Sequence, residues 1–357
     1  MHQPTTNIFP MTIGLDLGSK TTQCAIYGTN GKRIEERKVT TDREHLTTLL
    51  GRFPGSRVVM EASTASRWIN NLAKELGCEV IIANPRSIPI ITASVRKCDR
   101  NDARLLAELG QFKPDLLSPV QLRADRYQEV RALLFARMQL VKQRSALVTF
   151  IRSEVRVLGY SLPSCGTKVF AAKCRGLIPD SLRMALGPIF DSIQTMTEGI
   201  KTYDKSIDEL GDRQFPETMV LRQVHGVGPL VGLAFVATIG DPHRFDKSRT
   251  IGAYLGLVPR IHQSGKSNPA LGITKCGDGY MRSLLVSAAT RILGPHGPDS
   301  DLRRFGERIA AQGGKRAKAR ARIAVARKLG VLLHCLLRTG EVYEPLRNNE
   351  EACTEAA

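Results

Sequence analysis

Four acidic side chains in the first third of the chain have the type and spacing needed to bind divalent metal ions. Asp16 lies inside an apolar run that predicts a β-strand, and Glu61 ends another such run. Asp99 and Asp102 stand three residues apart, so they share one face of a helix. Carboxylate oxygens suit Mg²⁺ or Mn²⁺, and paired metal ions can clamp the attacking and leaving oxygens of a phosphodiester. If these elements converge, the four residues form a metal-dependent catalytic site.

Each acid also has a structural explanation when it is considered alone. Asp99 could cap a helix, and Glu61 could be a solvated strand end. Asp16 is harder to explain in this way, because a carboxylate between Leu15 and Leu17 is costly if it is buried without a partner. The metal-site hypothesis therefore depends most on Asp16.

A polar, glycine-containing segment in the second half of the chain is another candidate for chemistry. Ser264 stands in His262-Gln263-Ser264-Gly265-Lys266. This is not a phosphate-binding P-loop, because that motif needs a glycine where the chain has Arg260. From the residues alone, an ordinary loop serine explains Ser264 best, and Ser267 competes with it as a nucleophile. The basic residues that could offset charge on a reacting phosphate are Arg260, Lys266, Lys275 and Arg282.

Two further segments have features of nucleic-acid binding. Gly226 and Gly228 stand in a segment that resembles a helix-hairpin-helix, whose glycines let backbone N–H groups approach a phosphate, although a plain tight turn explains them equally well. Closer to the C-terminus, no acidic residue interrupts the stretch from Arg308 to Gly340. The basic run in this stretch is either a solvated helix face or a phosphate-contacting surface. Its first members are Lys315, Arg316, Lys318, Arg320 and Arg322.

The elements that would position the acidic residues alternate between strands and helices. Short apolar runs predict strands at 11–17, 23–27, 33–38, 57–61 and 79–83, with a turn between the second and third. Helices are predicted from the N-cap Asp42 to Leu50, over 64–76 and over 101–110. A hairpin followed by strand–helix alternation predicts an α/β domain with a mixed sheet.

From about residue 123 the apolar period becomes that of long helices. One row of residues recurs every seven positions, and a companion row contains two arginines. The first row is Tyr127, Leu134, Val141, Val148 and Val155, and the companion row is Val130, Arg137, Arg144, Ile151 and Leu158. These two rows and a second helical stretch at 181–210 predict an antiparallel coiled-coil arm that protrudes or dimerises. The alternative is an ordinary helical bundle within one domain. A mainly helical domain is predicted beyond residue 216.

The composition favours a nucleic-acid partner. The net charge of +18 attracts polyanions, and the release of counterions from phosphates would supply much of the binding. No apolar run approaches the roughly 20 residues that span a bilayer, and the first ten residues lack the pattern of a secretory signal. The eight cysteines form no CxxC pair, which argues against structural zinc and favours reduced thiols in a cytoplasmic protein.

Together, these motifs resemble the DEDD transposases, or recombinases, of prokaryotic insertion sequences of the IS one-ten type. The matching pieces are Gly14-Leu15-Asp16-Leu17-Gly18, Met60-Glu61-Ala62-Ser63 and Lys97-Cys98-Asp99-Arg100-Asn101-Asp102-Ala103, and the resemblance spans nearly the whole chain. The family usually has Thr where this chain has Cys98. By the resemblance, Asp16, Glu61, Asp99 and Asp102 are catalytic and metal-binding. The family's nucleophile is the serine of a Ser-Gly element after Leu-Gly-Leu-x-Pro, which corresponds here to Ser264.

The resemblance also implies an architecture, a reaction and partners. It implies a RuvC-like, RNase H-like domain at 1–120, a helical arm at 121–215, a mainly α transposase domain at 216–345 and a tail at 346–357. The implied reaction is Mg²⁺-dependent (or Mn²⁺-dependent) DNA strand exchange through a covalent phosphoserine–DNA link. A structured guide RNA, called a bridge RNA, would select donor and target DNA. The active site would be shared within a homo-oligomer, a dimer or tetramer, at the nucleoid of a prokaryotic cell.

Three alternatives remain open at the level of sequence. A RuvC-like Holliday-junction nuclease would cut DNA with water and would form no serine adduct. An actin-like sugar kinase or ATPase has a first phosphate loop like residues 13–21, but the chain contains no second Asp-x-Gly loop after it. A basic DNA-binding scaffold would show no metal-dependent strand chemistry. Trapping of a covalent protein–DNA adduct separates the recombinase from the water-using nuclease.

Overall fold

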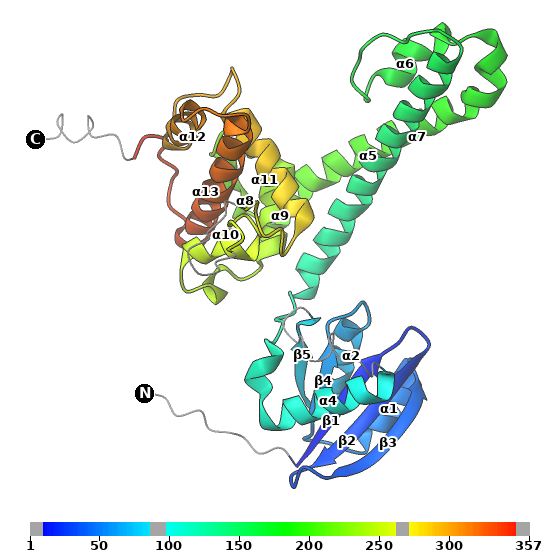
Figure 1. The fold of residues 1–357 in the computed structure, drawn as a ribbon, viewed down its shortest axis with the longest axis vertical. Coiled ribbons are helices and arrows are strands. Elements are labelled where there is room, and N and C mark those ends of the chain that lie inside the picture. The colour runs from blue at the N-terminus through cyan, green and yellow to red at the C-terminus, as the bar shows by residue number, and fades with distance from the viewer. Residues whose placement is uncertain (1–9, 86–97, 262–270, 348–357) are drawn as a thin grey trace, which may run out of the picture. The chain divides into compact units, whose positions relative to one another are not determined.

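The computed structural model describes residues 10–85, 98–261 and 271–347. The chain divides into two compact units, residues 1–122 and 123–357 (Figure 1). Ser264 and Lys266 lie outside the described residues.

The first unit is built on a five-stranded mixed sheet. β1 (Met11–Leu17), β2 (Thr21–Gly28) and β3 (Arg33–Thr40) form an antiparallel meander. β4 (Arg57–Glu61) pairs parallel with β1, and β5 (Glu79–Ala83) pairs parallel with β4, which gives the order β3-β2-β1-β4-β5. The predicted α/β domain with a mixed sheet is confirmed, and β2 and β3 are longer than predicted because their polar ends also pair.

Helices cover both faces of this sheet. α1 (Arg43–Gly51) and α2 (Ser66–Glu75) pack on the face that carries Leu15 and Met60. α4 (Asp99–Phe112) packs on the opposite face, where Leu106 and Val59 share a core, and the short helix η2 (Pro114–Leu117) follows it. Asp42 caps α1 as predicted, since its carboxylate accepts a hydrogen bond from the N–H of His45 at 2.8 Å.

In the second unit, two long helices form the arm. α5 (Asp125–Val157) and α7 (Asp180–Gln214) run antiparallel, and α6 (Phe170–Cys174) and η3 (Arg175–Leu177) lie between them in sequence. The two arginines of the predicted seam have partners on α7: Arg137 pairs with Asp204 at 2.6 Å, and the buried Arg144 donates to the Thr197 hydroxyl at 3.2 Å. The seam is shorter than the five heptads predicted, because Leu158 lies beyond α5 and is exposed.

The arm helices contribute to two separate cores. At the end of the arm that carries α6, which is called the arm tip below, apolar side chains of α5, α6 and α7 pack together; they include Val148, Ile151, Val155, Phe170, Phe190 and Ile193. At the other end, Tyr127, Val130 and Leu134 of α5 belong to the core of the remaining helices. Figure 1 shows α6 at the end of the pair remote from those helices.

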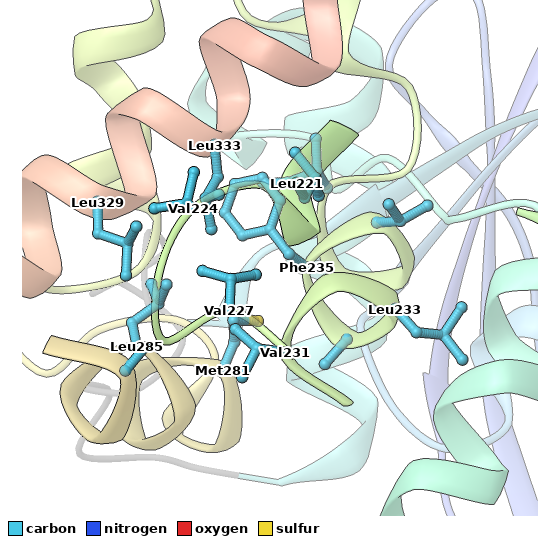
Figure 2. Close-up of a cluster of buried hydrophobic side chains, with 14 of the residues drawn as sticks. Leu221, Val224, Val227, Val231, Leu233, Phe235, Met281, Leu285, Leu329 and Leu333 are labelled. Carbon is cyan, nitrogen blue, oxygen red and sulfur yellow. The ribbon is translucent and has the colours of Figure 1, made fainter. Parts of the chain in front are cut away.

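The remaining helices form a compact helical body. They are α8 (Thr218–Arg222), α9 (Pro229–Ile239), η4 (Pro242–Arg244), η5 (Ser248–Thr250), α10 (Ile251–Tyr254), α11 (Gly279–Ile292), α12 (Asp301–Ala311) and α13 (Ala317–Thr339). Figure 2 shows side chains of this core, among them Leu221, Phe235, Leu285 and Leu333. The predicted mainly helical character is confirmed. No helix within the described ranges is long and apolar enough to cross a membrane.

Candidate active site and nucleic-acid interface

Asp16 and Glu61 lie at the same end of two neighbouring parallel strands. In the register of β1 with β4, Leu15 pairs with Met60, and Asp16 and Glu61 are the next residues of their strands. Side chains alternate between the two faces of a sheet, so both acids share the α4 face, opposite to the buried Leu15 and Met60. The fold therefore places two of the predicted acids at one sheet edge, on the face that α4 covers.

The first turn of α4 lies at that same end of the sheet. A Cβ at Gly14 would stand 2.1 Å from the carbonyl oxygen of Ala103, and a Cβ at Gly110 would stand 2.3 Å from a methyl of Val59. The helix thus runs against the direction of β1, with residue 103 opposite residue 14 and residue 110 further back. Asp99 and Asp102, both in the first turn, are consequently at the end where Asp16 lies.

Three side-chain contacts hold α4 in this position on β2 and β3. The Tyr27 hydroxyl donates to Glu108 at 2.9 Å, and burial with this bond raises the pKa of Tyr27 to about 12. Arg104 donates to the Glu36 carboxylate on β3, and the amide of Gln111 donates to the carbonyl oxygen of Gly28. These bonds, which extend from Arg104 to Gln111, fix the helix relative to the strands.

An open hollow of about 520 Å³ adjoins the acidic edge. Gln23, the residue of β2 that lies directly opposite Asp16, and Asp99 both line it. The other lining residues are Glu36, Arg37, Lys38, Cys98 and Arg100. Basic side chains thus stand beside carboxylates in the lining of this hollow.

The donor set fits a hard divalent cation in chemistry. All four predicted ligands offer carboxylate oxygens, and the positive end of the α4 dipole favours negative charge at Asp99 and Asp102. Neither Glu61 nor Asp99 forms an ion pair with a Lys or Arg that the structure describes. Within the described ranges, no group of three or more acidic, Cys or His side chains is already gathered closely enough to hold a metal ion.

The described stretches on either side of residues 262–270, which include Ser264, pair with each other. The N–H of Arg260 donates to the carbonyl oxygen of Gly272 at 2.9 Å, and Pro259 and Ile273 form an isolated bridge. Next to this pairing, the backbones of Gly256 and Cys276 also approach closely. Gly256 has a φ of +66°, and a Cβ there would stand 2.0 Å from the carbonyl oxygen of Cys276. The described ends of the segment are therefore held close together.

The sequence reasoning missed a buried ion pair that supports this region. Asp278 caps α11 by accepting hydrogen bonds from the N–H groups of Tyr280 and Met281, and Arg131 of α5 pairs with it at 2.6 Å. Burial alone would raise the pKa of Asp278, but the N–H of Met281 and the Arg131 guanidinium outweigh it and hold that pKa below its usual value. The sequence pattern before α11 could have indicated Asp278 as an N-cap, but nothing in the sequence indicates that Arg131 pairs with it.

The predicted basic contacts have different surroundings. Arg260 and Lys275 are exposed on the two sides of the Ser264 segment. Arg282 is half-buried, and its guanidinium donates to the carbonyl oxygens of Leu255 and Cys276 at 2.9 and 3.2 Å. Arg282 therefore fixes the backbone near the segment and is less free to contact a phosphate than the other two.

The two glycines of the predicted hairpin also differ. Gly226 has a φ of +87°, and a Cβ there would stand 2.9 Å from the carbonyl oxygen of Ala288, so the residue is needed for packing on α11. Gly228 caps α9 and has open space where its Cβ would stand. Of these two glycines, only Gly228 has space beside its backbone for the close approach of a phosphate.

The basic run begins just before α13 and continues along its first turns. Its five predicted members are all exposed, and none forms an ion pair with a described Asp or Glu. Arg320 donates to the carbonyl oxygen of Gly313 at 3.0 Å, and Arg322 donates to that of Lys318. Their charges are therefore not neutralised by described parts of the chain, as a phosphate-binding surface requires.

Two family models match this chain. A transposase model of the DEDD type, named for IS110, matches residues 13–158, which include the sheet, α4 and α5. A model described as transposase IS116/IS110/IS902 family matches residues 219–303, which include α8 to α11 and the Ser264 segment. The matches thus cover both regions in which candidate catalytic residues lie.

Similar proteins align over most of their own lengths. The chain is 28% identical over 339 residues to a transposase for insertion sequence element IS1111A from Coxiella burnetii, covering 93% of this chain and 90% of that protein. It is 26% identical over 344 residues to a probable family 20 transposase from Pseudomonas aeruginosa, covering 93% and 98%. It is also 26% identical over 278 residues to a pilin gene-inverting protein from Moraxella bovis, covering 74% of each chain.

Proposed function

The chain belongs to the IS116/IS110/IS902 family of transposases and is a DNA transposase or recombinase, and we propose that it exchanges DNA strands with an acidic metal site and a serine nucleophile. The observation that carries the proposal is the meeting of Asp16, Glu61 and the first turn of α4 at one edge of the sheet. An acidic edge of this kind in a DNA recombinase is suited to phosphodiester chemistry.

We propose that residues 1–120 form a RuvC-like domain whose Asp16, Glu61, Asp99 and Asp102 hold Mg²⁺ or Mn²⁺. When bound, such a cation supplies positive charge that stabilises a reacting phosphate. The protein's own contribution is to fix the carboxylates, which it does through the contacts of Gly14 and Tyr27 with α4. The division of the following chain into an arm at 121–215 and a transposase domain at 216–345 is part of the same proposal.

In the proposed reaction, the Ser264 hydroxyl attacks a DNA phosphorus atom. Its proton passes to solvent, the bond from Oγ to phosphorus forms, and the bond from phosphorus to one deoxyribose oxygen breaks. That oxygen takes up a proton from solvent and becomes a free strand hydroxyl. A hydroxyl of the partner strand then attacks the phosphoserine, restores the serine and joins the new strand. Arg260 and Lys275, exposed beside the segment, are placed to offset charge on the phosphate.

The partners of this reaction are DNA, a structured guide RNA and further copies of the chain. Transposition and the gene inversion for which the Moraxella bovis relative is named both need strands to be cut and rejoined with new partners. The basic run of α13 supports a nucleic-acid partner of either kind. A dimer or tetramer acting at the nucleoid of a prokaryotic cell would bring two such sites to two DNA segments.

A covalent adduct tests the proposal. The full chain with Mg²⁺ and DNA carrying the element ends should form a protein–DNA adduct that resists denaturant. Ser264→Ala should lose the adduct and recombination while it keeps nucleic-acid binding, because one hydroxyl contributes little to an interface dominated by phosphates. Mass spectrometry of the digested adduct should locate the nucleotide on Ser264.

Ser267→Ala is the matched control, since it removes a hydroxyl three residues away. This variant should retain both the adduct and recombination. An adduct that survives Ser264→Ala but not Ser267→Ala would mean that Ser267 is the nucleophile. DNA cleavage that needs Asp16 but never gives an adduct would favour the water-using Holliday-junction nuclease.

A further inference from the structure

The arm tip contains a hollow that the proposed reaction does not use. Its volume is about 300 Å³, and it lies where α5 ends and the chain turns away. Its lining residues are Thr149, Arg152, Ser153 and Arg156 of α5 and Tyr160, Ser161 and Leu162, which follow that helix. Apart from the apolar Leu162, the lining is entirely cationic, hydroxyl-bearing or aromatic, and no carboxylate takes part.

The two arginines of this hollow are not neutralised by acidic side chains. Neither Arg152 nor Arg156 forms an ion pair with a described Asp or Glu. Other arginines of the arm do so: Arg175 pairs with Asp191 at 2.5 Å, and Arg183 pairs with Asp180 at 2.8 Å. The carbonyl end of α5 opposes the two charges only in part, because a helix end carries about half a unit charge. The hollow is therefore electropositive.

Arg152 is held in place by the chain itself. Its guanidinium donates to the carbonyl oxygens of Leu162 and Pro163 at 3.1 and 2.8 Å, and it lies 5.0 Å from the centre of the Phe170 ring. Because these contacts fix the group before a ligand arrives, less side-chain entropy is lost when the ligand binds. Arg156 is exposed and free to adjust to the ligand.

The aromatic side chain of the hollow is exposed. Tyr160 is 57% exposed, so it is open to contact with a ligand from solvent. Exposed rings beside cationic side chains are the usual platform on which unpaired bases stack, while the cations contact the adjoining phosphates. A base within a duplex does not present its face in this way.

We propose that the arm-tip hollow binds one nucleotide of an unpaired nucleic-acid strand, with the phosphate at Arg152 and Arg156 and the base on Tyr160. The inference rests on the proposed function only in taking nucleic acid as the ligand. The phosphate and the base face are common to RNA and to single-stranded DNA, so the source of the strand is decided by experiment.

Photocrosslinking to the full chain tests the site directly. The probes are a short oligouridylate containing 4-thiouridine, the matching oligothymidylate containing 4-thiothymidine, and the latter annealed to its complement. We expect an adduct on the peptide that contains Tyr160 with the single strands, and little adduct with the duplex. A higher yield with the ribose probe assigns the site to RNA, and a higher yield with the deoxyribose probe assigns it to single-stranded DNA.

Variants test the roles of the named residues. Tyr160→Ala should lower the yield of this adduct at least about fivefold at limiting probe, since stacking on one ring is worth at least that factor, whereas Tyr160→Phe should retain it. Arg156→Gln should reduce the slope of log affinity against log salt by about 0.7, as expected for one lost single-strand phosphate contact. Lys173→Gln, which removes an exposed charge of the arm tip outside the hollow, should change neither quantity.

The possible failures can be told apart. Adducts that occur only on the helical body, or an adduct at the arm tip that Tyr160→Ala and Arg156→Gln leave unchanged, would overturn this inference and leave the proposed function intact. If no probe crosslinks to any part of the chain, the nucleic-acid partner itself is wrong, and both proposals fail together. Circular dichroism of each variant shows whether the arm has kept its helices.

Discussion

Asp278 in the helical unit and the predicted ligand acids in the sheet unit lie in different surroundings. In the helical unit, Asp278 is only 8% exposed, and Arg131 and two backbone N–H groups compensate its charge. In the sheet unit, Asp16 and Glu61 end neighbouring strands, and Asp99 and Asp102 occupy the helix turn beside them. A buried acid with an arginine partner serves the fold, whereas acids at neighbouring strand ends and a helix start suit the cation site proposed above.

The balance of charge follows the same division. Residues 1–122 contain 16 Lys and Arg against 12 Asp and Glu, whereas residues 123–357 contain 36 against 22. The excess of positive charge thus lies mainly in the helical unit, where nine basic and no acidic residues occur between Arg308 and Gly340. This distribution agrees with the proposed division between chemistry in the sheet unit and nucleic-acid binding in the helical unit, which substitutions can test.

The largest effect is expected from Asp16→Asn. The change keeps the shape of the side chain and removes a charge that the proposed cation needs, so recombination should fall by about three orders of magnitude or more. Far-UV circular dichroism and thermal unfolding should remain close to those of the parent protein, because relief of repulsion among the acids offsets lost contacts. Full recombination activity in this variant would remove Asp16 from the site and weaken the contrast with Asp278.

A smaller but still large effect is expected from Gly14→Ala. The new methyl would collide with the backbone of α4 at Ala103 and Ala107, so the sheet unit should lose about 3 kcal/mol of stability, and the acids should move apart. The single tryptophan, Trp68, lies in α2, so its fluorescence reports the unfolding of this unit alone. Gly51→Ala is the control: nothing lies within 4 Å of its Cβ position, and the variant should be unchanged or more stable.

The smallest effect is expected from Asp278→Asn. Asparagine can still cap α11, but the bond to Arg131 loses its charge, so the helical unit should lose about 2 kcal/mol at neutral pH. Since the pKa of Asp278 lies below 3.8 in the folded protein, its carboxylate stabilises the fold above that value, and this contribution is lost as the pH falls further. The measurement is helix melting followed by circular dichroism from pH 7 down to about pH 3.

In this comparison the parent protein should lose stability in acid faster than Asp278→Asn does. Equal acid sensitivity of the two proteins would show that Asp278 is not compensated in the way its contacts indicate. Trp68 fluorescence should be unchanged by this substitution, because the residue lies in the other unit.

Much of the sheet unit could be predicted from local patterns. The bounds of β1, β4 and β5 follow from short apolar runs between turn residues, and the cap of α1 follows from Asp42. The start of α4 at Asp99 was placed two residues late, because its N-cap, Cys98, makes no side-chain hydrogen bond and gives no signal. The acids were found because their residue types stand out against an apolar or helical background.

Contacts between distant parts of the chain could not be predicted in this way. Arg131 and Asp278 are separated by 147 residues, and no periodicity relates them. The close approach of α4 to Gly14 and the hollow at the arm tip likewise arise only when separate elements pack. The heptad pattern identified the arm but not where the seam stops, since Leu158 fits the repeat in sequence and lies beyond the helix.

The two cores of the arm differ in when they can form. The core at the arm tip contains residues between Val148 and Ile193. At the other end of the arm, Tyr127 belongs to a core that extends to Leu336. Closing a short stretch of chain costs less entropy and happens sooner than closing a long one. During synthesis the arm tip can therefore close while α13 is still inside the ribosome, and the helical body must wait for the last helix before its core is complete.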